Sequence, residues 1–257
     1  EEGVDIQRLE APQLNFWDCP GLVDTIDSLA AMKYWVFDKK KYTMEQLLKA
    51  LKAEWEGYED MRQDFKDAPK FGNNDDYVDE IFGRATIDIS NIGNRILYFR
   101  NEPGGHMNAL IVTWMYHLAP FTGAMPNGRK RGEALCDGGI NPHADFDKGG
   151  PWDRMASAMK VDQSRFKAWI YNQKFDYGSV LGETGLDKLT DYFQAGMEGG
   201  MDQIQCNFVG KDTLKDAQSH PEKYPLLSVR VSGYSALFAP LSTFVQDAII
   251  ERVEQEL

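Results

Sequence analysis

The sequence predicts an α/β fold in which parallel strands alternate with helices. Two observations point to this class. Helical periodicity runs through the first part of the chain to about residue 100, and short strand-like segments separated by a helical one follow it. A hydrophobic share of 42%, with 12% aromatic residues, is enough for a substantial buried core in 257 residues. We therefore expect an ordered chain.

The helices of the first part are predicted from capping residues and apolar spacing. Thr43 and Gln46 have the spacing of a capping box. Apolar residues then recur at helical intervals at Leu47, Leu48, Leu51 and Trp55. After a turn at 69–72, the polar run 73–76 supplies helix-start residues, and the helix is expected to end near Asn101. Its apolar stripe begins with Val78, Ile81, Phe82 and Ala85.

Three apolar segments are predicted as buried strands, over residues 109–116, 166–171 and 203–209. A polar, glycine-rich loop region is expected over 122–150. Further helices are predicted over Gly185–Met197 and from about Thr243. One face of the last helix carries Phe244, Val245, Ala248, Ile249 and Val253.

Charge and composition exclude several function classes. The net charge is −12 and the pI about 4.8, which argues against a nucleic-acid partner because phosphate backbones repel an acidic surface. No apolar run approaches the roughly 18 residues of a membrane span, and no signal peptide opens the chain, so we expect a cytoplasmic protein with no membrane partner. The first residues, Glu1-Glu2-Gly3, predict that the chain starts inside a longer protein.

The cysteines and histidines predict no metal site. Cys19, Cys136 and Cys206 form no CxxC pair, and their odd number gives no disulfide framework. The four histidines show no metal-ligand spacing. A reducing compartment fits this cysteine usage.

The segment Ser228–Phe238, SVRVSGYSALF, carries the decisive motif. A short β-like run is interrupted at Ser232-Gly233 and resumes with apolar residues. Composition alone indicates a turn or bulge, because glycine between strand-like flanks commonly marks one. The order of the residues is more specific than the composition.

The run 230–236 resembles the signature of the glycyl radical enzymes of the pyruvate formate-lyase superfamily. It consists of Arg230, Val231, Ser232, Gly233, Tyr234, Ser235 and Ala236. The resemblance continues through 213–228 and 245–254, and segments 69–80, 122–133 and 202–209 also match the family. It implies the C-terminal portion of an α/β barrel, with a helical segment of a barrel half (1–105), barrel strands and helices (106–210) and a glycyl radical domain (211–257).

The resemblance implies that Gly233 stores a backbone radical. Such a radical is stabilised when its Cα is planar between an amide nitrogen and a carbonyl, and only glycine lacks the Cβ that would crowd this arrangement. Val231, Tyr234, Leu237 and Phe238 are expected to shield it from water and oxygen. By the same resemblance no cofactor is bound. A separate radical S-adenosylmethionine enzyme installs the radical, which implies anaerobic conditions.

None of the three cysteines fits the thiyl residue of this family. Cys19 lacks the glutamate that many lineages have two residues later, Cys136 lies in the glycine-rich region, and Cys206 lies in a predicted buried strand. Each is expected to be a small buried hydrophobic residue. The resemblance therefore implies that the thiyl cysteine belongs to a preceding N-terminal half outside this chain.

Two further groups of residues are candidates by resemblance. Gly123, Pro126, Gly128 and Arg129 belong to the family's glycine-rich loop, in which Asn127 replaces the more usual acidic residue. Arg129 either holds an anionic group or fixes the loop, and the loop role is favoured. The candidate substrate-pocket residues are Trp17, Thr113, Trp114 and Tyr116, for which a core role is the alternative.

The expected activity begins with hydrogen abstraction from a small organic substrate. The run KAWIYNQKFDY at 167–177 favours the benzylsuccinate/alkylsuccinate synthases, which add a hydrocarbon to fumarate, with the C–S lyases next. C–N or C–O lyases, decarboxylases and formate acetyltransferases are alternatives, and small accessory subunits are possible partners. Two other hypotheses are a spare part that replaces an oxygen-cleaved radical domain and an α/β binding domain with a coincidental motif.

Overall fold

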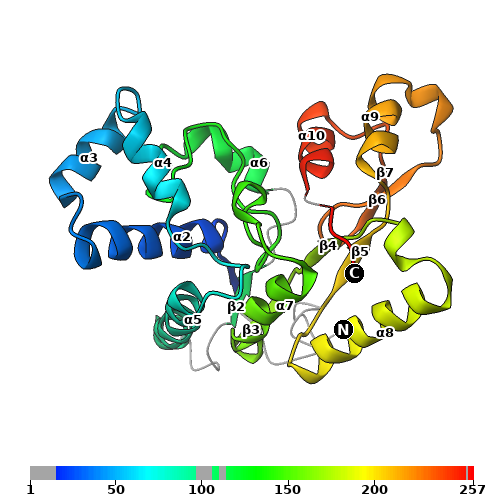
Figure 1. Ribbon diagram of the computed structural model, residues 1–257, viewed down its shortest axis with the longest axis horizontal. Coiled ribbons are helices and arrows are strands. Elements are labelled where there is room, and N and C mark those ends of the chain that lie inside the picture. The colour runs from blue at the N-terminus through cyan, green and yellow to red at the C-terminus, as the bar shows by residue number, and fades with distance from the viewer. Residues whose placement is uncertain (1–15, 97–105, 110–113, 253) are drawn as a thin grey trace, which may run out of the picture.

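The structure, a computed structural model, describes residues 16–96, 106–109, 114–252 and 254–257. Helices and short strands follow one another along the chain (Figure 1). Their bounds are β1 (Phe16–Asp18), α2 (Leu22–Met32), α3 (Met44–Lys52), α4 (Glu59–Asp67), α5 (Asp76–Ile96), β2 (His106–Ala109), α6 (Trp114–Leu118), α7 (Pro151–Met159), β3 (Phe166–Trp169), β4 (Asn172–Lys174), α8 (Gly182–Glu198), β5 (Gln205–Asn207), α9 (Lys211–Ser219), β6 (Ser228–Arg230), β7 (Ser235–Leu237) and α10 (Thr243–Glu251).

Parallel strands form two small sheets in the described part of the chain. One has the order β1-β2-β3, and the other pairs β4 with β5. A parallel bridge between Phe175 and Gln255 adds the C-terminal residues beside β4. The predicted α/β class with parallel strands is thus confirmed. Both sheets are open within the described residues, so closure into a barrel stays a prediction.

Helices α2 to α5 form the N-terminal part of the structure, at the left of Figure 1. The predicted capping box of α3 is confirmed, because the Thr43 hydroxyl accepts from the Gln46 N–H while the Gln46 side chain accepts from the Thr43 N–H. Leu47 of this helix is buried, whereas Leu48 is 52% exposed. The stripe of α5 is also confirmed, with Val78 and Phe82 fully buried.

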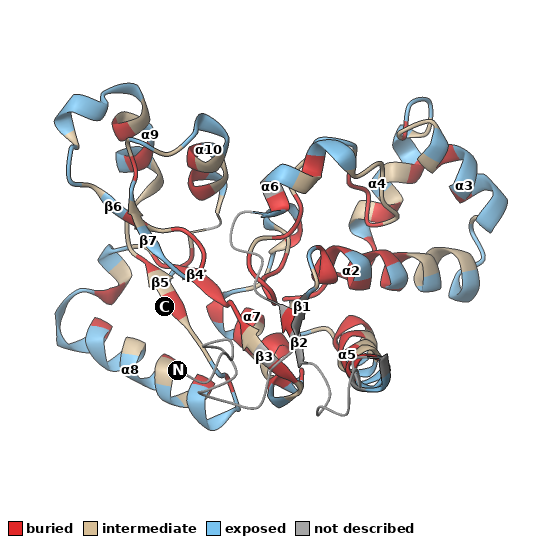
Figure 2. Ribbon diagram, turned by 180° about the vertical axis from the view of Figure 1, so that it is seen from behind, coloured by how far each residue is buried: buried red, intermediate tan, exposed pale blue. Residues whose placement is uncertain are grey.

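The largest hydrophobic core joins α2, α5, α7, α8 and the strands between them. Phe71 and Phe82 contact edge to face, with ring centroids 4.6 Å apart. Tyr192 of α8 packs against Phe175 at 5.2 Å. Buried residues therefore run along α2 and through the middle of the molecule, as the red segments in Figure 2 show. This core holds the ends of the parallel strands in place.

The C-terminal segment has a hydrophobic core of its own. Helices α9 and α10 pack on the antiparallel hairpin β6–β7 around Leu214, Val229, Phe238 and Ile249. We call this unit, residues 211–251, the C-terminal lobe. It lies at the upper right of Figure 1, on the far side of the strands from α2 and α3. Its separate core indicates that the hairpin is held mainly by the lobe itself.

Two predictions about single elements are wrong. Residues 109–116 are not one strand, because β2 ends at Ala109 and α6 begins at Trp114; residues 110–113 lie outside the described part. A continuous apolar run lacks the periodicity that separates a strand from a buried helix. The strand β1 was not expected in a region predicted as helical.

The last helix is confirmed from Thr243, but its buried face differs from the prediction. Gln246, Ile249 and Ile250 are buried, whereas Phe244 is 44% exposed; Val253 lies outside the described residues. Burial of Gln246 is possible because its amide donates to the carbonyl oxygens of Phe238 and Ala239. The predicted strands at 166–171 and 203–209 and the helix at 185–197 are confirmed as β3, β5 and α8.

The predicted divisions at residues 105 and 210 remain predictions. The largest core includes residues from both sides of residue 105, and the lobe core lies between residues 209 and 250.

None of the helices in the described residues is long and apolar enough to cross a membrane.

Candidate functional site

The hairpin β6–β7 presents the signature residues at its tip. Arg230 pairs with Ser235 across the two strands, and the Val231 N–H donates to the Tyr234 carbonyl oxygen at 2.9 Å. Ser232 and Gly233 therefore occupy the tip itself. Gly233 has φ +76°, in the left-handed region that a side chain with a Cβ rarely adopts. The turn alone thus favours glycine at this position.

Side chains hold both amide groups of Gly233. Its N–H donates to Oε1 of Gln205 at 3.3 Å, and its carbonyl oxygen accepts from Nη2 of Arg230 at 3.3 Å. Nε of Arg230 also donates to Oε1 of Gln205. Gly233, Arg230 and Gln205 therefore form a closed set of hydrogen bonds around one residue.

The base of the hairpin is tied to β5 and to the end of α10. Asn207 binds both backbone groups of Arg230, donating to its carbonyl oxygen and accepting from its N–H, each at 2.8 Å. Arg252 donates to the carbonyl oxygens of Arg230, at 2.7 Å, and of Val231. The same guanidinium forms an ion pair of 2.6 Å with Asp137, in the loop before α7. The hairpin is therefore linked to the rest of the structure through Asp137.

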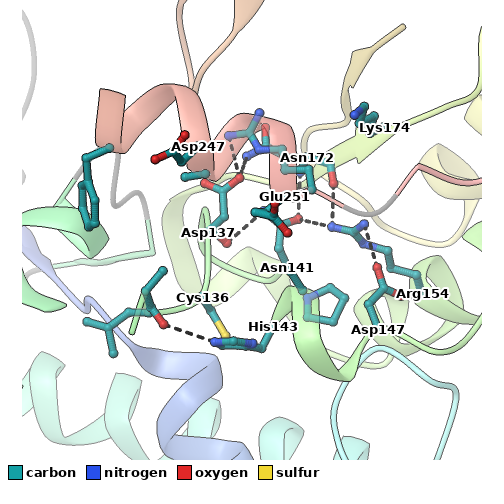
Figure 3. Close-up of a pocket in the computed structure, with 17 residues that line it drawn as sticks. Cys136, Asp137, Asn141, His143, Asp147, Arg154, Asn172, Lys174, Asp247 and Glu251 are labelled. Atoms are coloured by element: carbon teal, nitrogen blue, oxygen red, sulfur yellow. Dashed lines mark hydrogen bonds and ion pairs between the residues drawn. The ribbon is translucent and has the colours of Figure 1, made fainter. Parts of the chain in front are cut away.

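A cavity of about 290 Å³ lies between α10, β4 and the loop 134–147. Figure 3 shows Arg154 beside Asp147 and Asn141 on one side, while Asp247 and Glu251 project from α10. Arg154 and Asp147 form a buried ion pair of 3.2 Å. Burial raises the pKa of Asp147, although the Arg154 guanidinium opposes this shift.

The hairpin tip is less enclosed than expected. Val231 and Phe238 are buried in the lobe core, as predicted for the walls of the radical loop. Gly233 is exposed, and the other two predicted wall residues, Tyr234 and Leu237, are 39% and 43% exposed. Leu237 lies on the exposed face of β7, and Tyr234 lies in the turn before that strand.

The glycine-rich loop is held by hydrogen bonds within the structure. Arg129 is 1% exposed, and its guanidinium donates to the backbone carbonyl oxygens of Ala119, Thr122, Gly123 and Ala134. Burial lowers the pKa of this guanidinium. Asn127 donates to Asp24 of α2 at 3.0 Å and accepts from the Arg129 N–H. Arg129 therefore fixes the loop, the alternative that the sequence favoured.

The two predicted glycines of this loop differ. Gly128 has φ +96°, and a Cβ there would lie 2.4 Å from Cγ of Lys66. A Cβ on Gly123 would lie 3.2 Å from flexible atoms of Arg131 and Glu54. The backbone thus requires glycine at 128, whereas Pro126 is half-buried in the adjoining turn.

Of the candidate substrate-pocket residues, the structure describes the side chain of Trp114. Trp114 lies in α6 with 57% of its surface exposed, and it does not line the cavity. Trp17 lies in β1 and Tyr116 in α6, but the structure describes neither side chain, and Thr113 lies outside the described residues. A pocket role for these residues stays a prediction.

The cysteines are buried or half-buried. Cys136 and Cys206 belong to the largest core, and burial raises the pKa of the Cys206 thiol to about 12 and that of Cys136 well above its usual value. Cys19 packs against the same core. Within the described ranges, no group of three or more His, Cys, Asp or Glu side chains could hold a metal ion.

Sequence reasoning missed Gln205, Asn207, Asp137 and Arg252 as residues of the site. The segment 202–209 was noted as similar to the family, which is the signal that could have found the first two. Nothing in the local sequence singles out the other two, because their contacts with the hairpin depend on the tertiary fold.

Two family models match this chain. The one described as Pyruvate formate lyase-like matches residues 8–119, and the one described as Glycine radical matches residues 136–239, including Gly233. The chain belongs to the glycyl radical enzyme family. Its curated relatives include isethionate sulfite-lyase of Desulfovibrio desulfuricans, 36% identical, and trans-4-hydroxy-L-proline dehydratase of Clostridioides difficile, 37% identical. Each alignment covers 99% of this chain.

The fold is similar to solved structures of the same family. The B12-independent glycerol dehydratase of Clostridium butyricum matches with a TM-score of 0.89 and 32% identity, over 95% of this chain and 31% of that one. The chain also spans only 31% of the length of the isethionate sulfite-lyase and 32% of the length of the trans-4-hydroxy-L-proline dehydratase. It therefore corresponds to about a third of such an enzyme.

These comparisons correct the prediction that the chain belongs with the benzylsuccinate/alkylsuccinate synthases. The relatives are named as a sulfite-lyase and dehydratases, and others at 30% identity are named as decarboxylases. They favour the C–S and C–O lyases, which the sequence placed among the alternatives, over the hydrocarbon–fumarate synthases. The segment 167–177 was a poor guide to the branch, because it forms β3, β4 and part of the core around Tyr171, positions that packing constrains.

Proposed function

We propose that this chain supplies the radical-storing part of a glycyl radical lyase, with the radical on the Cα of Gly233. The supporting observation is the hairpin tip, where a glycine in the left-handed region has both its N–H and its carbonyl oxygen bound by side chains. Such a clamp keeps the two amide planes fixed on either side of the Cα. These two peptide groups are the ones that would share the unpaired electron of a Cα radical.

The proposed reaction is an elimination from a small organic substrate. The enzyme that cleaves S-adenosylmethionine takes one hydrogen atom from the Cα of Gly233, and Gly233 later takes a hydrogen atom from a cysteine thiol. The thiyl radical removes a hydrogen atom from the substrate. The neighbouring C–S or C–O bond then breaks, the leaving group departs as an anion with the bonding electron pair, and the substrate radical loses a proton. The product radical regains a hydrogen atom from the thiol, and the thiyl radical so formed takes the hydrogen atom back from the Cα of Gly233. The similarity to a sulfite-lyase and to dehydratases supports this class of leaving group.

Partners follow from the same proposal. The proposal assigns the thiyl cysteine to a segment outside this chain, because Cys136 is buried in the core, and Cys19 and Cys206 are half-buried and pack against it. That segment, the activating enzyme and the substrate are the proposed partners, while small accessory subunits and an oxygen-free cytoplasmic setting stay predictions of the sequence. A spare-part role is not favoured, since the alignments cover 99% of this chain rather than the lobe alone.

Anaerobic electron paramagnetic resonance of the complete enzyme, treated with its activating enzyme, tests the proposal. The native protein is expected to show an organic radical doublet, and Gly233→Ala is expected to lose the signal. Exposure to air should cut the native chain at residue 233. Absence of the doublet from the native protein, with the activating enzyme proven on a control substrate, would leave Gly233 as an ordinary turn glycine.

A further inference from the structure

Gln205 is the buried side chain that faces the amide nitrogen of Gly233. It lies in β5, 28 residues before Gly233, and is 7% exposed. Its backbone is fixed by the pairing of β5 with β4 and by donation of its N–H to the Tyr171 carbonyl oxygen at 3.0 Å. The side chain is therefore presented to the hairpin from a strand that does not belong to the lobe.

The orientation of the Gln205 amide is set by its neighbours. Two donors, the Gly233 N–H and Nε of Arg230, meet at one atom of this side chain. Only the oxygen can accept from both, because the amide NH₂ group offers donors alone. Nε2 has no hydrogen-bond partner among the described residues, although it is buried. A buried donor without a partner, such as Nε2 of Gln205, costs free energy. The Gln205 side chain is therefore held in place by the two hydrogen bonds that its oxygen accepts.

The two hydrogen bonds on Gly233 polarise its peptide groups in the same sense. An acceptor on the N–H increases the electron-donating character of the nitrogen, and a donor on the carbonyl oxygen increases the electron-withdrawing character of that group. Gln205 supplies the first and Arg230 the second. A radical centred on the Cα between them is stabilised by both effects, because it shares its electron with a donor on one side and an acceptor on the other.

We propose that Gln205 is a positioning residue that stabilises the stored radical through the N–H of Gly233. This inference rests on the proposed radical role of Gly233. The strand β5 would then stabilise the radical in addition to binding the base of the hairpin through Asn207. Arg230, which is part of the sequence motif, donates to the carbonyl oxygen of Gly233. Its guanidinium also donates to Gln205 and to the Ser235 hydroxyl.

The test uses the complete enzyme with three variants. Gln205→Leu removes the acceptor, Gln205→Glu keeps an acceptor oxygen, and Gln203→Leu is the matched control on the same segment. Gln203 accepts from the Tyr171 N–H at 3.2 Å, and within the described part of the chain its side chain forms no hydrogen bond with the hairpin. Each variant is activated anaerobically, and electron–nuclear double resonance measures the hyperfine coupling of the exchangeable amide proton of Gly233. The half-life of the radical without substrate is measured in parallel.

Gln205→Leu is expected to change the amide-proton coupling and to shorten the half-life roughly two- to tenfold, the range for loss of one hydrogen bond. Gln205→Glu and Gln203→Leu are expected to keep the native coupling. The hyperfine coupling is measured only on molecules that carry the radical, so a variant that folds in low yield still gives a value. A native coupling and half-life in Gln205→Leu would overturn the inference. A native enzyme without any radical would instead overturn the proposed function.

Discussion

Cys206 lies in β5 between Gln205 and Asn207, the two residues that hold the hairpin. Its own side chain points to the other face of the strand, into the largest core, where burial raises its pKa to about 12. Neighbouring residues of β5 thus have different roles, because they face opposite sides of the strand. The polar side chains bind the hairpin, and the thiol fills space in the core.

This burial predicts how Cys206 reacts. In the native enzyme, alkylation of Cys206 by iodoacetamide is expected to be slow at pH 7 and still to climb about tenfold per pH unit up to pH 10, because the thiolate fraction of a thiol with a pKa of about 12 stays small and rises steadily over this range. Mass spectrometry of peptides from labelled protein measures the rate. Labelling in urea is the control and should be fast. A native rate that is already fast at pH 7 and levels off near pH 9 would show an accessible thiol with an ordinary pKa of about 8.5.

At the scale of elements, the glycine-rich loop depends on one side chain. The Arg129 guanidinium binds four carbonyl oxygens between residues 119 and 134, and the Trp55 indole donates to the Arg129 carbonyl oxygen at 3.2 Å. Three of these carbonyl groups, those of Thr122, Gly123 and Ala134, lie outside the helices and strands that the structure describes. A planar, five-donor group satisfies them from the centre of the loop.

Arg129→Lys is expected to lower the local stability of this loop by about 2–4 kcal/mol, since an ammonium group cannot reach all four oxygens and leaves buried carbonyl groups unpaired. Hydrogen exchange of residues 119–134, followed by mass spectrometry, measures the change. Arg131→Lys is the matched control, because Arg131 is 54% exposed and forms an ion pair with Glu54 at 2.9 Å. Its expected effect is below about 1 kcal/mol. Equal exchange in both variants would contradict the structural role of Arg129.

At the scale of the molecule, the lobe has a core of its own, and Val245 and Ala248 of α10 also pack against the small core of Met115 and Leu135 outside the lobe. Phe238 and Ile249 belong to the lobe core and to no other. The polar links across the boundary include the hydrogen bonds between Gln205 and Gly233 and between Asn207 and Arg230. Arg252 adds a third link, because it donates to the Arg230 carbonyl oxygen and pairs with Asp137. The cavity of about 290 Å³ lies at the same boundary.

Separate cores predict separate responses to a cavity mutation. Phe238 is fully buried, so Phe238→Ala is expected to lower the stability of the lobe by about 3–5 kcal/mol. Hydrogen exchange in residues 211–251 should rise, while exchange in 22–96 stays native. Leu226→Ala is the control, because Leu226 is 82% exposed and its loss removes little buried surface. A matching rise in residues 22–96 would show that the two cores unfold as one unit.

Local signals predicted most elements correctly. The Thr43–Gln46 capping box, the start of α10 at Thr243 and the α8 helix all depend on neighbouring residues, which the sequence displays directly. The strand expected over 109–116 failed because its run of apolar residues has no periodicity, and burial of Gln246 on α10 depends on carbonyl oxygens supplied by Phe238 and Ala239.

By itself, the sequence determined the family, the α/β class and the position of the glycine motif, because a motif of adjacent residues and the spacing of apolar side chains are local properties. Only the tertiary structure decided which residues surround Gly233. Gln205 lies 28 positions away, and Asp137 reaches the hairpin through Arg252. Such contacts arise when β5, α10 and the loop before α7 pack together, and hydrogen bonds between them leave no pattern along the chain.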